Sequence, residues 1–195
     1  MDKKNNIIDA KDFFNNRANL YNKVSKWTLN NELSLETIKM ISKVSFNNVL
    51  DVGAGTGVLL SRLEKDISKV ALDQSEEMLK IIDDSAIIKV KGDAHEMPFI
   101  SESFDLIITR QMLHYCDIKR VFDNIYRVLS SNGIFHIVQV ITQPNVSEKW
   151  NNEWVNLRKV KKREHLSKSI INGYINDFKF KEIKYNEILL RDDYS

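Results

Sequence analysis

A glycine-rich segment preceded by a carboxylate is the part of the chain whose residue types are best suited to chemistry. Gly53, Gly55 and Gly57 follow the apolar run "NVLDV", and Asp51 lies two residues before the first of them. Glycine lets a backbone turn tightly and approach a bound group closely, so turns of this composition hold nucleotide cofactors. The candidates are nicotinamide dinucleotides, flavins, ATP and S-adenosylmethionine.

The spacing of these glycines argues against a dinucleotide. The pattern Gly-x-Gly-x-x-Gly requires a third glycine where this chain has Val58. A carboxylate at Asp51 would repel a pyrophosphate but would suit an ammonium group. ATP is disfavoured as well, because no Lys-Ser or Lys-Thr pair follows the glycines. The loop therefore favours a cofactor with a cationic amino-acid end and no phosphates, and a nicotinamide dehydrogenase stays as a competing hypothesis.

A second acidic residue stands at the end of the next apolar run. Asp73 ends "KVALD", 22 residues after Asp51. An acid at the tip of a second parallel strand can accept hydrogen bonds from ribose hydroxyls. The alternative is that Asp73 merely precedes a helix.

The elements that must position these residues begin with helices. Residues 9–44 have helical patterning, and Asp9 is suited to cap the first helix. A second helix is predicted from about Ser34. Its expected apolar face consists of Leu35, Ile38, Ile41 and Val44.

From residue 46 onwards, short apolar strands alternate with helices. Strands are predicted at 48–52, 69–73, 86–90, 103–110 and 133–140, and helices at 58–66, 75–82 and 118–129. Ser75 and Asp117 are expected to cap two of these helices, and Gly133 to end the last in a left-handed turn within 130–133. This alternation predicts an α/β fold with a doubly wound, mostly parallel sheet and helices on both faces.

The C-terminal part is less regular. Helices are predicted over 147–163 and 166–177, and one final strand over 178–190. We expect residues 1–45 to form an N-terminal helical extension that serves as a lid or substrate region. Residues 46–195 are expected to form a Rossmann-like domain with a helical insertion at 143–165.

Composition excludes several classes of protein. The net charge of +2 and the pI of about 8.5 are too mild to indicate nucleic-acid binding. Cys116 is the single cysteine, so neither a disulfide framework nor a thiolate metal cluster is expected. The sequence has no signal-peptide pattern and no apolar run long enough to span a membrane. These features predict a cytoplasmic protein without a metal site.

Four motifs, in order, resemble those of class I S-adenosylmethionine-dependent methyltransferases. They are "VLDVGAGTG", "VALDQSEEML", "VKGDAHEMPFISESFDLIITRQMLHY" and "RVLSSNGIFHIVQ", within residues 47–140. The resemblance is greatest to the small-molecule branch that includes menaquinone and ubiquinone C-methyltransferases. Nucleic-acid methyltransferases that act on amino groups have an Asn/Asp-Pro-Pro-aromatic motif where this chain has "RQML". The family's Pro-Gly-Gly or Asp-Gly-Gly turn is replaced here by "SSNG".

The resemblance implies a role for each matching residue. Asp51, Gly53, Ala54, Gly55 and Gly57 would hold the methionine end of the cofactor, Asp73 its ribose, and Gln74, Met78, Asp93 and Ala94 its adenine. Arg110 and Gln111 would border the sulfonium and the substrate, and Tyr21 is a candidate lid residue. Met78 could instead belong to the core, Asp93 could form a turn after Gly92, and Arg110 could be a surface charge.

Methyl transfer from a sulfonium is an in-line displacement that needs alignment and a dry site. A base is required only if the nucleophile must lose a proton. His114, after the fourth strand, is the candidate base, and its alternative is a packing role. The predicted function is methylation of a small-molecule acceptor. A non-catalytic or regulatory subunit is the alternative.

Class I methyltransferases usually end with two antiparallel strands, whereas this sequence supplies one candidate, at 178–190. The seventh strand is therefore predicted to be missing. A sheet that lacks it would leave the fifth strand at an open edge. Three outcomes are open: the sixth strand lies beside the fifth, a second chain completes the sheet, or the sequence is truncated. Of these we expect association, with a homodimer or a partner subunit covering that edge.

Overall fold

The computed structural model describes residues 9–25, 31–64, 66–139, 166–178 and 180, and its strands form one parallel sheet. The strands are β1 (Asn48–Val52), β2 (Ser68–Asp73), β3 (Ile87–Lys91), β4 (Phe104–Arg110) and β5 (Leu129–Val138). Their order across the sheet is β3-β2-β1-β4-β5, and each neighbouring pair is parallel. The predicted doubly wound α/β fold is confirmed.

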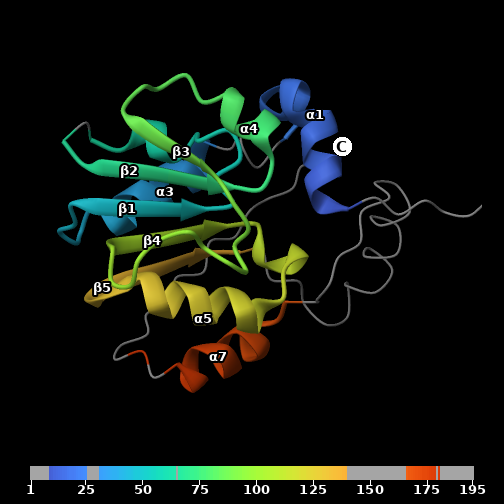
Figure 1. The fold of residues 1–195 in the computed structure, drawn as a ribbon. Coiled ribbons are helices and arrows are strands. Elements are labelled where there is room, and N and C mark those ends of the chain that lie inside the picture. The colour runs from blue at the N-terminus through green and yellow to red at the C-terminus, as the bar shows by residue number, and fades with distance from the viewer. Residues whose placement is uncertain (1–8, 26–30, 65, 140–165, 179, 181–195) are drawn as a thin grey trace, which may run out of the picture.

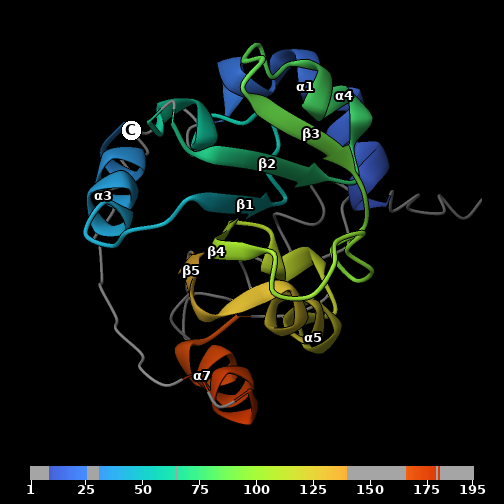
Figure 2. The same cartoon turned by 60° about the vertical axis from the view of Figure 1, so that its left-hand side comes forward.

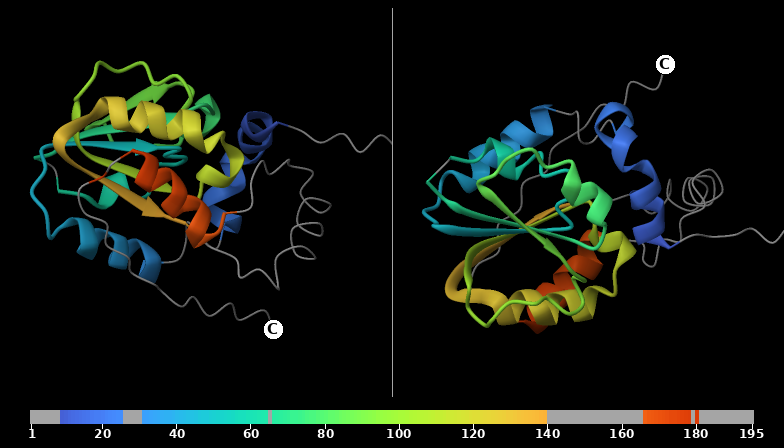
Figure 3. Two further views of the ribbon diagram at one scale, coloured as in Figure 1. Left: turned by 90° about the horizontal axis from the view of Figure 1, so that it is seen from below. Right: turned by 45° about the horizontal axis from the view of Figure 1, so that its top comes forward.

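Helices cover both faces of this sheet (Figures 1 and 3). The helical segments are α1 (Ala10–Val24), α3 (Asn31–Ile41), η1 (Leu60–Arg62), α4 (Glu76–Lys80), η2 (Leu113–Tyr115), α5 (Ile118–Val128) and α7 (Lys168–Asp177). Successive strand residues point to opposite faces, so each strand contributes to two cores. Leu50 and Ile107 pack with α5 and α7, whereas Val49 and Leu106 pack with α3, η1 and α4.

Local capping signals correctly placed the starts of three helices. Asp9 accepts a hydrogen bond from the Lys11 amide, Ser75 from the Met78 amide and Asp117 from the Arg120 amide. Each cap satisfies a backbone N–H that has no partner within its own helix. The helix predicted over 166–177 is present as α7.

The helix predicted over 58–66 is wrong, because the described residues of this segment, 58–64 and 66, contain only the short 3₁₀ turn η1. Leu63, which follows the turn, has its carbonyl capped by the buried ammonium of Lys69 at 3.0 Å. That side-chain contact takes the place of the next backbone bond of a helix. The chain then enters β2 at Ser68.

The turn predicted at 130–133 is also wrong. Strand β5 begins at Leu129, immediately after α5, and residues 130–133 form an irregularity within it. Phe104 pairs with Leu129 and Leu106 with Ile134, so these four residues lie opposite one residue of β4. Gly133 has no positive φ. It is required by close packing instead, because a Cβ there would lie 2.6 Å from the Leu129 side chain.

The predicted apolar face of the second helix is confirmed in part. Ile41 is buried and Ile38 packs against the core as predicted, but Leu35 is 60% exposed and Val44 follows the end of α3. Leu33 and Thr37 are buried instead. Thr37 can be buried because its hydroxyl donates to the Leu33 carbonyl at 2.7 Å. Burial of polar groups that have such partners carries little cost.

Two predicted elements lie outside the described residues: the helix over 147–163 and nearly all of the strand over 178–190. Within the part of the chain that is described, the sheet has five strands, and β5 lies at its edge. No helix in the described part is both long and apolar enough to cross a bilayer.

Candidate functional site

The glycine loop leaves β1 at the carboxyl edge of the sheet, where ligands bind in open α/β folds. Gly53, Gly55 and Gly57 all have positive φ, between 55° and 72°. A Cβ at Gly53 would meet Met112 at 2.9 Å, and one at Gly57 would meet Ile82 at 2.9 Å. Gly55 has no atom within 4 Å of its Cβ position, so it faces open space. Two glycines thus allow close packing, and the third borders a hollow.

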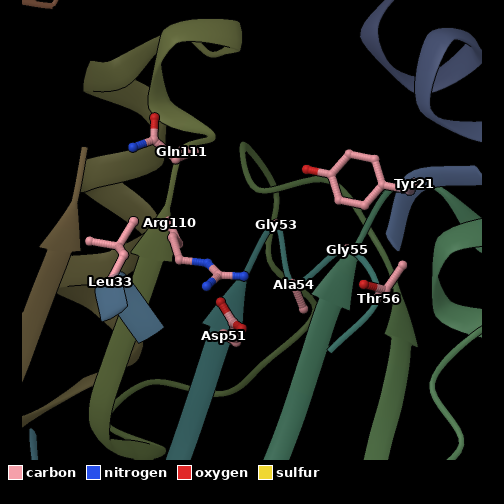
Figure 4. Close-up of a pocket in the computed structure, with 9 residues that line it drawn as sticks. All are labelled: Tyr21, Leu33, Asp51, Gly53, Ala54, Gly55, Thr56, Arg110 and Gln111. Carbon is pink, nitrogen blue, oxygen red and sulfur yellow. The ribbon is translucent and has the colours of Figure 1, made fainter. Parts of the chain in front are cut away.

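That hollow is a pocket, and Figure 4 shows the side chains that line it. Its lining comprises Tyr21, Leu33, Asp51, Gly53, Ala54, Gly55, Thr56, Arg110 and Gln111. All of these except Leu33 and Thr56 were predicted. Leu33 had no sequence signal, because it reaches the site from α3. Thr56 could have been inferred from its place inside the glycine loop.

Asp51 is the most unusual group in the pocket. Its side chain is buried, and its Oδ1 atom has no hydrogen-bond partner among the described residues. Burial raises the pKa of Asp51 to about 7, against the opposing charge of Arg110 and with a smaller contribution from Asp73. A buried carboxylate without a partner is costly unless a cation or a donor is supplied. The site therefore suits a ligand with a positive group at this position.

Arg110 provides the opposite charge. Its guanidinium extends from the end of β4 toward Asp51 (Figure 4). One of its nitrogens, Nη1, donates to the hydroxyl of Ser34 on α3 at 3.1 Å. Ser34 is fully buried. Arg110 is thus a pocket residue tied to the N-terminal region, and the alternative of a surface charge is not what the structure shows.

Asp73 joins the glycine loop to the helix that follows β2. Its Oδ2 accepts from the Gly55 amide and its Oδ1 from the Ser75 amide, each at 2.8 Å. Burial raises the pKa of Asp73, and these backbone hydrogen bonds lower it in part. Asp73 does not itself line the pocket. Each carboxylate oxygen has a second lone pair, so the group can still accept from a ligand hydroxyl.

The residues predicted near an adenine lie outside the pocket lining. Gln74 is exposed, Met78 is 1% exposed and Ala94 packs against the core. Asp93 accepts from the His95 amide at 2.9 Å. Burial alone would raise the pKa of Asp93, but its bonds to His95 and the charges of His95 and Arg120 bring it below the usual value.

Helix α1 lies beyond the carboxyl ends of the strands (Figures 1 and 2) and closes over the loops. Asn22 accepts a hydrogen bond from Thr56 of the glycine loop at 2.6 Å. Asn15 accepts one from Ser75, the cap of α4, also at 2.6 Å. Sequence reasoning singled out Tyr21 on this helix and missed both asparagines. Their spacing of seven residues, two helical turns, was the available signal.

His114 lies in η2, next to the end of β4. Its ring packs against Tyr115 with 4.0 Å between ring centroids, and its Nδ1 lies 3.2 Å from Gln139 Nε2. Gln139 follows β5 and was not predicted, because a lone glutamine has no motif.

The comparisons with known proteins agree with this geometry. A family model described as "Methyltransferase domain" matches residues 50–137. An uncharacterized protein of Methanocaldococcus jannaschii is 33% identical over 181 residues, covering 89% of this chain and 68% of the relative. A demethylmenaquinone methyltransferase of Thermotoga maritima is 29% identical over 133 residues, covering 64% and 57%.

Solved structures show the same fold. A Thermotoga maritima structure described as a SAM-dependent methyltransferase, possible histamine N-methyltransferase, has a TM-score of 0.70 at 20% identity. The match covers 87% of this chain and 82% of that one. The chain spans 44% of the length of an uncharacterized methyltransferase of Mycobacterium tuberculosis, to which it is 33% identical over 106 residues, or 53% of this chain. On its motifs, its fold and the family model that matches residues 50–137, the chain contains a methyltransferase domain with the class I fold.

Proposed function

We propose that this chain transfers a methyl group from S-adenosylmethionine to a small-molecule acceptor. The observation that carries the proposal is the buried Oδ1 of Asp51 beside the glycine loop, which has no hydrogen-bond partner in the part of the chain that the structure describes. An ammonium group there would supply the missing donor and the missing charge. A pyrophosphate would instead bring a like charge toward a buried carboxylate.

The residues of the site fit the rest of this cofactor. Arg110 would pair with the carboxylate of its amino-acid end, since a guanidinium is the preferred partner of a carboxylate. The open space at Gly55 would let the amino-acid end of the cofactor approach the glycine loop closely. Asp73 would accept hydrogen bonds from the ribose hydroxyls, Gln74 would lie beside the adenine, and Asp93 would accept from the adenine amino group. When bound, the cofactor would supply an activated methyl group.

The chain's own residues would bind and orient the cofactor and exclude water from the site. Gly53, Ala54 and Gly57 shape the loop, and Tyr21 with α1 covers it. Met78 and Ala94 would support the adenine side from the core. Gln111 would border the acceptor. Charge neutralisation, alignment and removal of water are the contributions that an in-line displacement requires of a protein.

The small-molecule acceptor is supported by the name of the Thermotoga maritima relative, a demethylmenaquinone methyltransferase. It is also supported by "RQML" after β4, where amino-directed nucleic-acid enzymes carry a proline motif. A reducing cytoplasm would suit a chain that has a single cysteine, Cys116.

Calorimetry on the full chain tests the proposal. S-Adenosylhomocysteine should bind with micromolar affinity, and NAD should not bind. Binding of NAD without the methionine compounds would contradict the proposal and favour a dehydrogenase. If neither S-adenosylhomocysteine nor S-adenosylmethionine binds, the regulatory-subunit alternative is favoured. Asp51→Asn should weaken the binding of S-adenosylhomocysteine. Its matched control is Asp83→Asn, the same change at an exposed position away from the pocket.

A further inference from the structure

One histidine makes two hydrogen bonds to the carboxylate of Asp93. The Oδ1 atom of Asp93 accepts from the His95 amide at 2.9 Å and lies 2.5 Å from Nδ1 of the His95 ring. Its Oδ2 atom has no partner among the described residues. The Asp93 side chain is 57% exposed, whereas that of His95 is 15% exposed. One oxygen of the carboxylate is thus occupied by His95, and the other is available to a ligand.

A backbone amide identifies which ring nitrogen of His95 carries the proton. The Asp117 amide donates to Nε2 of His95 at 3.0 Å. A backbone N–H can only donate, so Nε2 must accept, and a neutral ring then carries its proton on Nδ1. Burial acts to raise the pKa of Asp93, but the bonds to His95 hold it below the usual value, so Asp93 is an ionised acceptor at neutral pH. Both partners of the ring therefore require the same tautomer.

Helix α5 anchors His95 on the side away from Asp93. Asp117 is the N-cap of this helix. In a capping box the residue three positions after the cap accepts from the cap's own amide. That residue is Arg120 here, which can only donate, and His95 supplies the acceptor instead. Asn124 of α5 also donates to the His95 carbonyl at 2.8 Å. The helix therefore fixes both the backbone and the ring of His95.

Asp93 lies at the same edge of the sheet as the glycine loop. Strand β3 ends at Lys91, which pairs with Asp73 of β2. The amide of the next residue, Gly92, donates to the Asp73 carbonyl at 3.0 Å. Asp73 in turn accepts from Gly55 of the loop. The ends of β1, β2 and β3 are thus joined by hydrogen bonds, and Asp93 follows the third of them.

We infer that His95 is a positioning residue that holds the Asp93 carboxylate so that Oδ2 accepts from the amino group of the adenine. The inference rests on the proposed function, which places the adenine at Asp93. Without the bond from Nδ1, only the His95 amide would restrain this exposed side chain. A carboxylate that is already oriented loses less rotational freedom when the ligand binds, so the affinity is higher.

Two variants of His95 separate this role from a purely structural one. The side-chain nitrogen of asparagine is as many bonds from Cβ as Nδ1 of histidine, and the side-chain oxygen of glutamine is as many bonds from Cβ as Nε2. His95→Asn therefore keeps the donor to Asp93 and loses the acceptor for the Asp117 amide. His95→Gln keeps that acceptor and loses the donor to Asp93.

Calorimetry with S-adenosylhomocysteine on the full chain compares the two variants. His95→Gln should lose roughly twofold to tenfold in affinity, the effect of one hydrogen bond, and His95→Asn should bind nearly as the wild type does. If His95 only anchored α5, His95→Asn would be the weaker binder. That ranking, or equal affinities of the two variants, would overturn the inference. Thermal melts confirm that each variant is folded.

Two further variants sharpen the comparison. Glu96→Gln removes the exposed ion pair between Glu96 and Arg120 in the same segment, and it should leave the affinity unchanged. Asp93→Ala provides a double-mutant cycle. His95→Gln should cause no further loss in the Asp93→Ala background, because its effect passes through Asp93. An additive loss would contradict the inference.

Nitrogen NMR of the full chain labelled with ¹⁵N-histidine reads the tautomer without any ligand. The chain has four histidines, and the His95→Asn variant identifies the signals that belong to His95. We expect a protonated Nδ1 and an unprotonated Nε2 at pH 8. A proton on Nε2 would overturn the inference, because that nitrogen could not then accept from the Asp117 amide.

These outcomes are distinguishable from failure of the proposed function. A wild-type chain that does not bind S-adenosylhomocysteine would refute the methyltransferase proposal, and the adenine role of Asp93 with it. A wild-type chain that binds S-adenosylhomocysteine, with His95→Asn as the weaker of the two variants, would refute only the role of His95.

Discussion

Thr56 on the glycine loop donates a hydrogen bond to Asn22 on α1, with 2.6 Å between the two oxygens. This contact links residues 34 positions apart in the sequence. Together with the bond from Ser75 to Asn15 it ties one helix to both loops that follow β1 and β2. Helix α1 is thereby part of the site. Cofactor binding and the position of α1 should be coupled.

The coupling predicts that Asn22→Ala and Thr56→Val weaken S-adenosylhomocysteine binding by similar amounts. A hydrogen bond of this kind contributes about 0.5–1.5 kcal/mol, so each variant should lose roughly twofold to tenfold in affinity. The double variant should lose little more than either single one, because both remove the same bond. Calorimetry on the wild type, the two single variants and the double variant measures this double-mutant cycle. Asn19→Ala, exposed on α1, is the control, and strictly additive losses would rule out the coupling.

Asp51 predicts an unusual dependence of stability on pH. Because burial raises its pKa from 3.8 to about 7, the folded protein holds a proton that the unfolded chain releases over this range. The contribution of Asp51 to the free energy of unfolding should therefore fall as pH rises from about 4 to 7 and then level off. Asp51→Asn removes this loss, so its ligand-free Tm should exceed that of the wild type at pH 8, and the difference should shrink steadily as the pH falls from about 7 to about 4.

Ligand affinity should change in the opposite direction. The ionised form of Asp51 is the partner of an ammonium group, so S-adenosylhomocysteine affinity should rise with pH up to the pKa of Asp51. Asp51→Asn should lose about tenfold or more at pH 8, since charge-assisted hydrogen bonds contribute about 1.5–3 kcal/mol. Thermal melts and calorimetry check both effects. If Asp51→Asn and Asp83→Asn had the same Tm and the same S-adenosylhomocysteine affinity at each pH, Asp51 would not be a residue of the binding site.

Asp73→Ala should reduce both binding and stability. It removes the acceptor of the Gly55 and Ser75 amides, and under the proposal it also removes the ribose partner. We expect a loss of at least tenfold in S-adenosylhomocysteine affinity. Ser75→Ala is the comparison, because it leaves the carboxylate in place and removes only the α4 cap, at a cost of about 1 kcal/mol, and the bond to Asn15, so its loss of affinity should be smaller. Similar affinities for the two variants would refute the ribose role.

Substitutions at Gly55 and Gly57 should affect ligand binding and folding stability differently. Gly57→Ala places a methyl 2.9 Å from Ile82, so it should lower the Tm markedly. Gly55→Ala meets no atom and carries only the cost of a positive φ, about 1 kcal/mol. Its methyl would point into the space proposed for the cofactor, so S-adenosylhomocysteine affinity should fall in a protein that stays folded. Melting curves and calorimetry on both variants give the comparison.

The sequence by itself determined the features that depend on neighbouring residues. Helix caps at Asp9, Ser75 and Asp117 were predictable, because each side chain bonds an amide two or three positions away. The parallel strands were predictable from short apolar runs, since both faces of the sheet are buried. The glycine loop and Asp51 were recognised because they adjoin in sequence.

Only the tertiary structure decided which distant groups meet. Arg110 reaches Ser34 across 76 positions, and Gln139 reaches His114 across 25, and neither pair has a sequence pattern. The same applies to Lys69, whose ammonium donates to the Leu63 carbonyl just after η1, where helical patterning predicted a full helix. Such contacts depend on strand register and on how helices pack over the sheet edge. Both are set by burial of the whole core rather than by local preference.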